Sequence, residues 1–261
     1  MRRSLFLAAM CAAGLAAALA HADDHPIYYY AGASAGSVTA ANAWSSKNNT
    51  TDIVPADFES GNVIYRMAGS QDILITTMAP NLEAKVYGIL WYRGWGSFEL
   101  RNAANAKLLI GAGGMVPDGS MVGDRQFYLR MQVVLTADQT WRVGQATHVL
   151  QVTGGLQGDY SIDKTGPGVL LIGGDTGTFN VYDWPKTVIA GGTVRMAQAN
   201  IFSAGHELVF SGTNATQRAV LDLSTFNETL EDVLWYEAPG SCANNELIAP
   251  DKFKCYLSEL Y

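Results

Sequence analysis

Residues 159–183 carry charged side chains of the types that perform acid–base chemistry on sugars. Five such groups fall within this stretch, namely Asp159, Asp163, Lys164, Asp175 and Asp183. Cleaving a glycosidic bond requires an acid and a base that converge on one bond. These five charges are scattered and are not repeated at a regular spacing. The pattern favours solvated corners over a catalytic cluster, and we expect Lys164 to be one such exposed group.

Aromatic side chains form a second set with chemical potential. Trp91, Tyr92 and Trp95 flank Arg93, and Trp184 stands further along the chain. Exposed rings beside an arginine suit the flat faces of carbohydrates, but large rings also fill cores and end caps. Packing is the favoured interpretation of these rings. The candidate binding residues, should they be exposed, are Trp91, Tyr92, Trp95 and Trp184.

The sequence predicts no metal site, no cofactor and no catalytic residue. Beyond the N-terminal leader described below, the histidines are His25, His148 and His206, and none forms a His-x-x-His spacing. The only Gly-x-Ser-x-Gly match is residues 32–36, which no strand-then-helix pattern surrounds. We therefore expect a protein that is not an enzyme.

The N-terminus has the features of a secretory signal peptide over residues 1–22. Arg2 and Arg3 form a basic start, an apolar run covers residues 5–20, and residues 20–22 read Ala-His-Ala, as at a cleavage site. Two cysteines follow the leader, Cys242 and Cys255, and an even pair this close in an exported protein predicts one local disulfide.

The net charge of the chain limits which classes of molecule it is expected to bind. Removing Arg2 and Arg3 takes the formal net charge from −7 to −9, which argues against nucleic acid because phosphates need a basic patch. No later apolar run reaches the length of a membrane span, so we expect none in the mature chain. The oligomeric state is left open by these observations.

The elements that must position these residues are short strands. Helical periodicity is nearly absent after the leader, and short apolar or alternating runs end at Gly, Asn or Asp. Very short connections such as Gly191-Gly192 favour a solenoid over a sandwich or barrel. The predicted strands cover residues 86–91, 97–100, 107–110, 127–129, 132–135, 148–152, 187–189, 193–196, 207–210 and 219–223.

The segment SIDKTGPGVLLIGGDTGTF, residues 161–179, is predicted to be one turn of such a solenoid. Its apolar run 169–172 would be a strand, with corners at 166–168 and 173–174 where glycine permits positive φ. The sequence favours this structural reading over a phosphate cradle, because no helix follows the glycines. The candidate inward positions are Val169, Leu171, Val194, Val209 and Leu221.

The same region resembles the autotransporter-associated β-strand repeat, also called the passenger-associated transport repeat. The likeness lies in QTWRV at 139–143, LQVTG at 150–154, IDKTGPG at 162–168, LLIGG at 170–174 and VIAGGTV at 188–194. It covers residues 86–225 well and 27–85 loosely. The specific part is Lys-Thr-Gly-Pro-Gly at 164–168, whereas the flanking alternation is generic.

The resemblance implies an all-β, right-handed parallel β-helix with N- and C-terminal caps, exported to the cell surface or the medium. It implies no catalytic residues, because the repeat is architectural. The expected division is a signal peptide (1–22), an N-terminal cap with first strands (23–85), the β-helix (86–225) and a C-terminal cap with the disulfide (226–261).

Two functions are weighed. The first is a non-catalytic surface or matrix protein of adhesin or passenger type, which would bind a surface glycan or a protein. The alternative is a carbohydrate-active β-helix enzyme, a polysaccharide lyase or hydrolase. A cluster of acidic or basic groups on one face at adjacent turns would discriminate between them.

Overall fold

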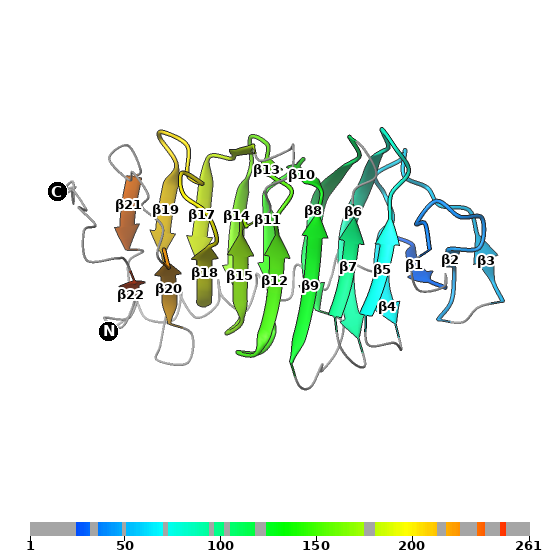
Figure 1. The fold of residues 1–261 in the computed structure, drawn as a ribbon, viewed down its shortest axis with the longest axis horizontal. Helices are drawn as coiled ribbons and strands as arrows, with labels where there is room; N and C mark the ends of the chain where they lie inside the picture. The colour runs from blue at the N-terminus through cyan, green and yellow to red at the C-terminus, as the bar shows by residue number, and fades with distance from the viewer. Residues whose placement is uncertain are drawn as a thin grey trace, which may run out of the picture.

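The structure is a stack of parallel strands. It is a computed structural model that describes residues 25–31, 36–48, 51–69, 73–93, 97–101, 105–117, 124–174, 181–212, 218–224, 234–237 and 246–248. Every regular element in these ranges is a β-strand, and the strands form a 14-stranded sheet and an 8-stranded sheet. Successive turns stack along one long axis (Figure 1). This confirms the predicted all-β parallel β-helix.

The larger sheet, here called sheet A, contains fourteen strands, including the antiparallel strands at the N-terminal end. Within it β8 (Lys107–Pro117) also pairs with β10 (Gln132–Leu135), so that β10, β13 (Leu156–Gln157) and β16 (Tyr182–Asp183) form a side ladder. Its strands are β1 (Ile27–Tyr30), β2 (Trp44–Ser45), β3 (Ile53–Val54), β4 (Ile64–Gly69), β6 (Glu83–Arg93), β8 (Lys107–Pro117), β10 (Gln132–Leu135), β11 (Gln139–Arg142), β13 (Leu156–Gln157), β14 (Ser161–Thr165), β16 (Tyr182–Asp183), β17 (Lys186–Ile189), β19 (Glu207–Phe210) and β21 (Leu234–Glu237).

The smaller sheet, sheet B, is a single parallel ladder in sequence order. Chain segments alternate between the two sheets, so each turn contributes a strand to both. Its strands are β5 (Ile73–Thr77), β7 (Ser97–Arg101), β9 (Arg125–Arg130), β12 (His148–Val152), β15 (Val169–Ile172), β18 (Gly192–Met196), β20 (Ala219–Asp222) and β22 (Glu246–Ile248). All the runs that the sequence predicts as strands overlap these elements.

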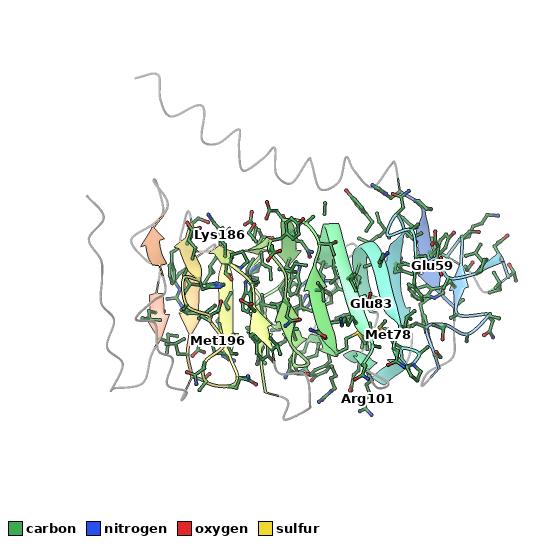
Figure 2. The ribbon with its side chains drawn as sticks, turned by 90° about the horizontal axis from the view of Figure 1, so that it is seen from above. Glu59, Met78, Glu83, Arg101, Lys186 and Met196 are labelled. Carbon is green, nitrogen blue, oxygen red and sulfur yellow. The ribbon has the colours of Figure 1, made fainter. Side chains whose placement is uncertain are left out.

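The interior is built from columns of residues that occupy the same place in successive turns. In sheet B one column places Phe98 next to Phe127, then Leu150, Leu170 and Val194. All five are nearly inaccessible to solvent, and the Phe98 and Phe127 rings stack with centroids 4.8 Å apart. Side chains fill the space between the walls along the length of the stack (Figure 2). Stacking of this kind buries apolar surface that no single turn could bury alone.

An aromatic cluster closes the N-terminal end of the stack. Trp44, which is completely buried, lies with its ring centroid 5.4 Å from that of Tyr30, 6.2 Å from Phe58 and 4.5 Å from Tyr65. Its Nε1 donates to the carbonyl oxygen of Val38 at 2.7 Å, so the one polar atom of the ring is satisfied.

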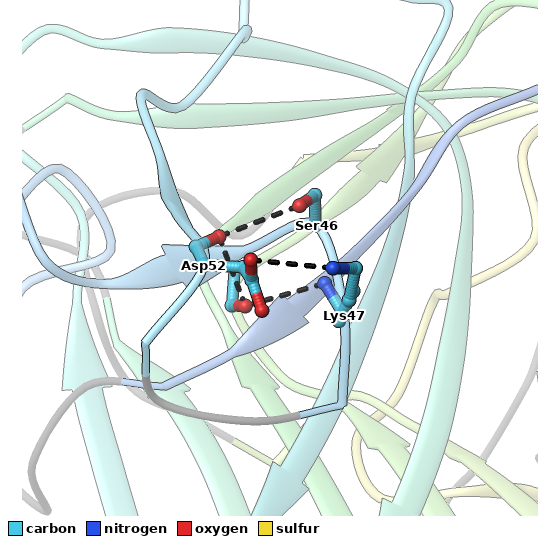
Figure 3. A network of polar contacts seen from close by, with 4 residues as sticks. Ser46, Lys47 and Asp52 are labelled. Carbon is cyan, nitrogen blue, oxygen red and sulfur yellow. Dashed lines mark hydrogen bonds and ion pairs between the residues drawn. The ribbon is translucent and has the colours of Figure 1, made fainter.

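The hairpin that carries Trp44 is held by polar contacts at its tip (Figure 3). The Ser46 N–H and hydroxyl both donate to the carbonyl oxygen of Asp52, and Lys47 Nζ lies 3.3 Å from Asp52 Oδ1. β1, β2 and β3 pair antiparallel, unlike the parallel pairing of the turns that follow. The cap therefore ends the parallel ladder with a different geometry.

The alternation in β15 corrects the predicted inward residues. Leu170 and Ile172 are completely buried, whereas Val169 and Leu171 are half-buried and lie on the outer face. Apolar runs without alternation do not reveal which parity points inward.

The other three predicted inward residues are buried. Val194 and Leu221 are completely buried, as predicted. Val209 is also buried, but it stands between the buried Leu208 and Phe210, so alternation places it on the opposite face from them.

The glycine corners are confirmed by their backbone angles. Gly166 has φ of 77°, and Gly173 and Gly174 have φ of 92° and 95°. At Gly166 a side chain is excluded by lack of space as well as by the backbone angle. A Cβ there would lie 2.4 Å from the carbonyl oxygen of Val143 in the preceding turn. No helix of the described residues is long and apolar enough to cross a membrane.

We expect Gly166→Ala to cost far more stability than Gly205→Ala. Both glycines have similar positive φ, 77° and 80°, but a Cβ at Gly205 would meet no atom within 4 Å. The Gly205 variant should lose about 1 to 2 kcal/mol from backbone strain alone. The Gly166 variant should lose about 3 kcal/mol or more, because two backbones must also separate. Urea denaturation of both variants measures this difference, and equal losses would show that turn-to-turn contact at this corner is unimportant.

Candidate functional site

Lys164, the charged residue of the Lys-Thr-Gly-Pro-Gly segment, points into the solenoid. It occupies the inward column of sheet A between Trp141 and Ile189, with which it pairs in register, and its exposed fraction is 0%. The expectation that Lys164 is a solvated corner is therefore wrong. The alternation of β14 is responsible, since Ile162 and Lys164 share the inner face.

The Lys164 ammonium group is fully used in hydrogen bonds to backbone carbonyl oxygens. Nζ donates to Thr165 O at 3.1 Å, to Gly166 O at 2.8 Å and to Gly191 O at 2.8 Å. Thr165 and Gly166 belong to the corner that follows β14, and Gly191 belongs to the corner one turn later. Lysine has three donors, which match these three acceptors.

The tight corners explain why a lysine is needed inside an apolar column. The closely packed glycines bring the carbonyl oxygens of Gly166 and Gly191 within reach of the interior. A buried carbonyl oxygen without a donor is costly, so a long side chain that ends in three N–H groups stabilises both corners together. Lys164 is thus a clamp between two turns.

Burial is the main influence on the pKa of Lys164. Removal from water lowers its pKa to about 7, although three carbonyl oxygens favour the charged ammonium form. The hydrogen-bond partners of Lys164 are backbone carbonyl oxygens, and the residue is completely buried. The arrangement positions backbone, and it offers no acid or base to a bound molecule.

His206 is the centre of a second buried polar group, which the sequence analysis missed. His206 Nδ1 lies 2.6 Å from the carbonyl oxygen of Trp184, and Nε2 lies 3.1 Å from the Thr187 hydroxyl. Trp184 Nε1 donates to the same hydroxyl at 2.9 Å. A carbonyl only accepts, so Nδ1 carries the proton and Nε2 accepts from Thr187. Each group then has a partner while the imidazole is neutral.

The neutral imidazole predicts a loss of stability in mild acid. Burial lowers the pKa of His206 to about 4, against 6.5 for an ordinary histidine. Between these values the unfolded chain binds a proton that the folded chain does not, so stability falls as pH falls from about 6.5 to about 4.

The measurement is urea denaturation of the parent and of His206→Asn at pH 7.5 and pH 5. Between these pH values the parent should lose about 2 kcal/mol more than the variant, whose side chain does not titrate. Equal losses in the two proteins would mean that His206 is not the group responsible.

The structure corrects the aromatic platform at the two positions where it describes the side chains. Trp91 and Trp184 are 3% and 1% exposed, so neither ring can stack on a sugar. The ring centroid of Trp91 lies 5.8 Å from that of Phe127, and that of Trp184 lies 4.9 Å from that of His206. Large rings fill the wide interior columns, which is the packing role weighed above.

Asp138, which directly precedes β11, and Asp163, on the outer face of β14, form a second candidate grouping. Asp138 Oδ1 accepts from Ser161 N at 2.8 Å and from the Ser161 hydroxyl at 2.9 Å, and these bonds lower the pKa of Asp138. Burial and the negative charge of Asp138 raise the pKa of Asp163, which Lys186 partly offsets. Carboxyl groups whose pKa values move apart are typical of acid–base sites.

An ion pair between Lys186 and Glu207 lies next to these aspartates. Lys186 pairs in register with Ser161, and its Nζ lies 3.1 Å from Glu207 Oε2 (Figure 2 labels Lys186). The side chains of Lys186 and Glu207 are 33% and 30% exposed, so water screens the pair.

The structure describes four of the five charges singled out in the sequence, and Lys164 and Asp163 among them point to opposite faces. Lys164 faces inward and Asp163 outward from the same strand, while Asp159 and Asp183 are exposed at other places on the surface. Asp138 was missed because it lies a full turn before its partner Ser161, and strand register alone reveals that contact.

Several sequence predictions fall outside what the structure describes. These are the leader over residues 1–22, Trp95, Asp175, the side chain of Tyr92, and the cysteines Cys242 and Cys255. Within the described residues, no three His, Cys, Asp or Glu side chains are grouped so as to hold a metal ion.

Comparisons with protein-family models, with curated proteins and with solved structures found no match for this chain.

Proposed function

We propose that this chain is an exported β-helical surface or matrix protein of adhesin or passenger type, which binds through an extended face and carries out no chemistry. The observation that carries the proposal is the use of Lys164. The segment Lys-Thr-Gly-Pro-Gly is the most specific part of the chain, and Lys164 is its reactive group. Lys164 Nζ donates to carbonyl oxygens of two corners, so none of its three protons is available to a substrate.

Two further features support this reading. Trp91 and Trp184, the two candidate binding tryptophans whose side chains the structure describes, are buried in the core. His206 is enclosed in a neutral hydrogen-bonded group. The resemblance of residues 86–225 to a passenger repeat and the leader-like residues 1–22 both point to export to the cell surface or medium.

A carbohydrate-active enzyme is the second candidate, and the Asp138–Asp163 pair favours it. Asp138 is bonded to Ser161, and Asp163 lies two residues further along β14 on the same face. At the usual strand rise Ser161 and Asp163 are on the order of 7 Å apart along the strand. Glycosidases also act through two carboxyl groups, one of which serves as the acid.

The test is a turnover assay of the purified protein on neutral and acidic polysaccharides, following reducing-end release and unsaturated-product absorbance. We expect no turnover by the parent protein, with or without added calcium. Asp163→Asn and Asp138→Asn are the informative variants, and Lys107→Met is a surface control. Activity in the parent that Asp163→Asn abolishes would replace the binding proposal with the hydrolase or lyase alternative.

A further inference from the structure

The outer face of sheet B carries an uncharged strip across four adjacent strands. Successive turns place Tyr128 beside Gln151 and Gln151 beside Leu171, and a parallel column places Val149 beside Val169 and Val169 beside Thr193. These side chains are half-buried and point away from the core, whose residues alternate with them in β9, β12, β15 and β18. We define the uncharged strip by these residues, Tyr128, Val149, Gln151, Val169, Leu171 and Thr193.

Ion pairs bound the strip at both ends of its first column. On the N-terminal side Tyr128 pairs in register with Glu99, whose carboxylate lies 2.5 Å from Arg101 Nε and 2.6 Å from Arg130 Nε. On the C-terminal side Leu171 pairs with Arg195, whose Nε lies 2.6 Å from Asp222 Oδ2. Each bounding charge has a partner, so a charged ligand would have to compete with it.

The side chains of the strip match a neutral sugar. The Gln151 amide and the Thr193 hydroxyl both donate and accept hydrogen bonds, as sugar hydroxyls do, and the Tyr128 hydroxyl, which donates to Gln126, can accept one. The aliphatic side chains Val149, Val169 and Leu171 offer contact to the C–H faces of pyranose rings. The Tyr128 ring is fixed by its hydroxyl bond to Gln126 and by the Arg130 guanidinium, which lies 5.5 Å from the ring centroid.

The strip alone is smaller than the interface that a folded protein partner needs. Four strands at about 4.8 Å spacing span roughly 15 Å, and the strip therefore covers on the order of 200 Å². A stable protein–protein interface needs about 800 Å² per partner, and usually a cluster of aromatic or arginine anchors. An added peptide strand would require a free sheet edge, whereas the strip lies on the face of the sheet.

We propose that the uncharged strip of sheet B binds a short stretch of a neutral glycan chain. The proposal rests on the proposed binding function and deepens it, by assigning the face and the chemical class of the ligand. The glycan lies across β9, β12, β15 and β18, with Gln151 at the centre as its main hydrogen-bonding group.

The experiment measures binding of the purified full chain to immobilised glucan, mannan and galactan, with polyuronate and a sulfated polysaccharide as acidic comparators. We expect binding to at least one neutral polysaccharide, unchanged by an about tenfold rise in ionic strength because the contacts are uncharged. Gln151→Leu keeps the side-chain volume and removes the amide, and should weaken binding at least tenfold. Gln157→Leu, a half-buried glutamine on β13 outside the strip that accepts a hydrogen bond from Gln132, is the control and should bind like the parent.

Thermal melts of both variants verify that they are folded. Absence of neutral-glycan binding, or binding that Gln151→Leu leaves unchanged, overturns the assignment of the strip. Salt-sensitive binding to the acidic comparators alone, or capture of a protein that Gln151→Leu does not release, overturns it too. The two proposals fail separately, since polysaccharide turnover would remove the proposed function, whereas binding elsewhere on the surface would remove only the strip.

Discussion

Replacing Leu170 with aspartate should destabilise the protein by about 4 kcal/mol or more, because the new carboxylate would be buried without a partner. Leu170 is completely buried in the column that also holds Leu150 and Val194. A domain is typically stable by only 5–15 kcal/mol, so the variant is expected to be largely unfolded at moderate urea. Chemical denaturation followed by circular dichroism measures the loss.

Leu171→Asp is the matched control for this prediction. The two leucines are neighbours in β15, but Leu171 lies half-buried on the outer face. Its carboxylate would stay hydrated, and the cost should be about 1 kcal/mol or less. Equal losses in the two variants, or a larger loss for Leu171→Asp, would contradict the inward parity of the strand.

Lys164→Met should cost about 2–4 kcal/mol of stability, although it removes a buried charge. Methionine fills a similar volume but offers no donor, so the carbonyl oxygens of Gly166 and Gly191 lose their charge-assisted bonds. Thr165 O is affected less, because it also accepts from Val143 N at 3.0 Å. Lys164→Ala should cost more than Lys164→Met, since it also leaves a cavity.

Lys107→Met is the control, because Lys107 makes an exposed ion pair with Glu83 at 3.2 Å. That substitution should change stability by less than about 1 kcal/mol. If Lys164→Met proved no more costly than Lys107→Met, the corner clamp would be refuted.

The pH dependence tests the burial of Lys164 independently of its hydrogen bonds. The folded pKa of Lys164 is about 7 and the ordinary value is 10.5, so unfolding takes up a proton between these pH values. Rising pH therefore favours the folded parent over this window, while Lys164→Met lacks the effect. The stability gap between parent and variant should widen from pH 7 to pH 10. A constant gap would mean that the folded and unfolded pKa values are the same.

Much of the architecture could be predicted from local patterns. Short apolar runs between glycines predicted the strands, and the Gly166–Pro167–Gly168 corner was recognised because positive φ favours glycine. The candidate site was less predictable. Asp138 and Ser161 are 23 residues apart, and their contact depends on which strands become neighbours.

The amino-acid sequence by itself determined the strands, their corners and the parallel solenoid, since turn chemistry and hydrophobic runs act over a few residues. Only the tertiary structure decided which face each side chain occupies. The run Val169–Ile172 is apolar at every position, so it fits either parity, and stacking against neighbouring turns selects Leu170 and Ile172. The same selection turned Lys164 inward, where carbonyl oxygens from two turns meet its ammonium group. Hydrogen bonds between turns cannot be read from a single turn, because their partners come together only when the coil is stacked.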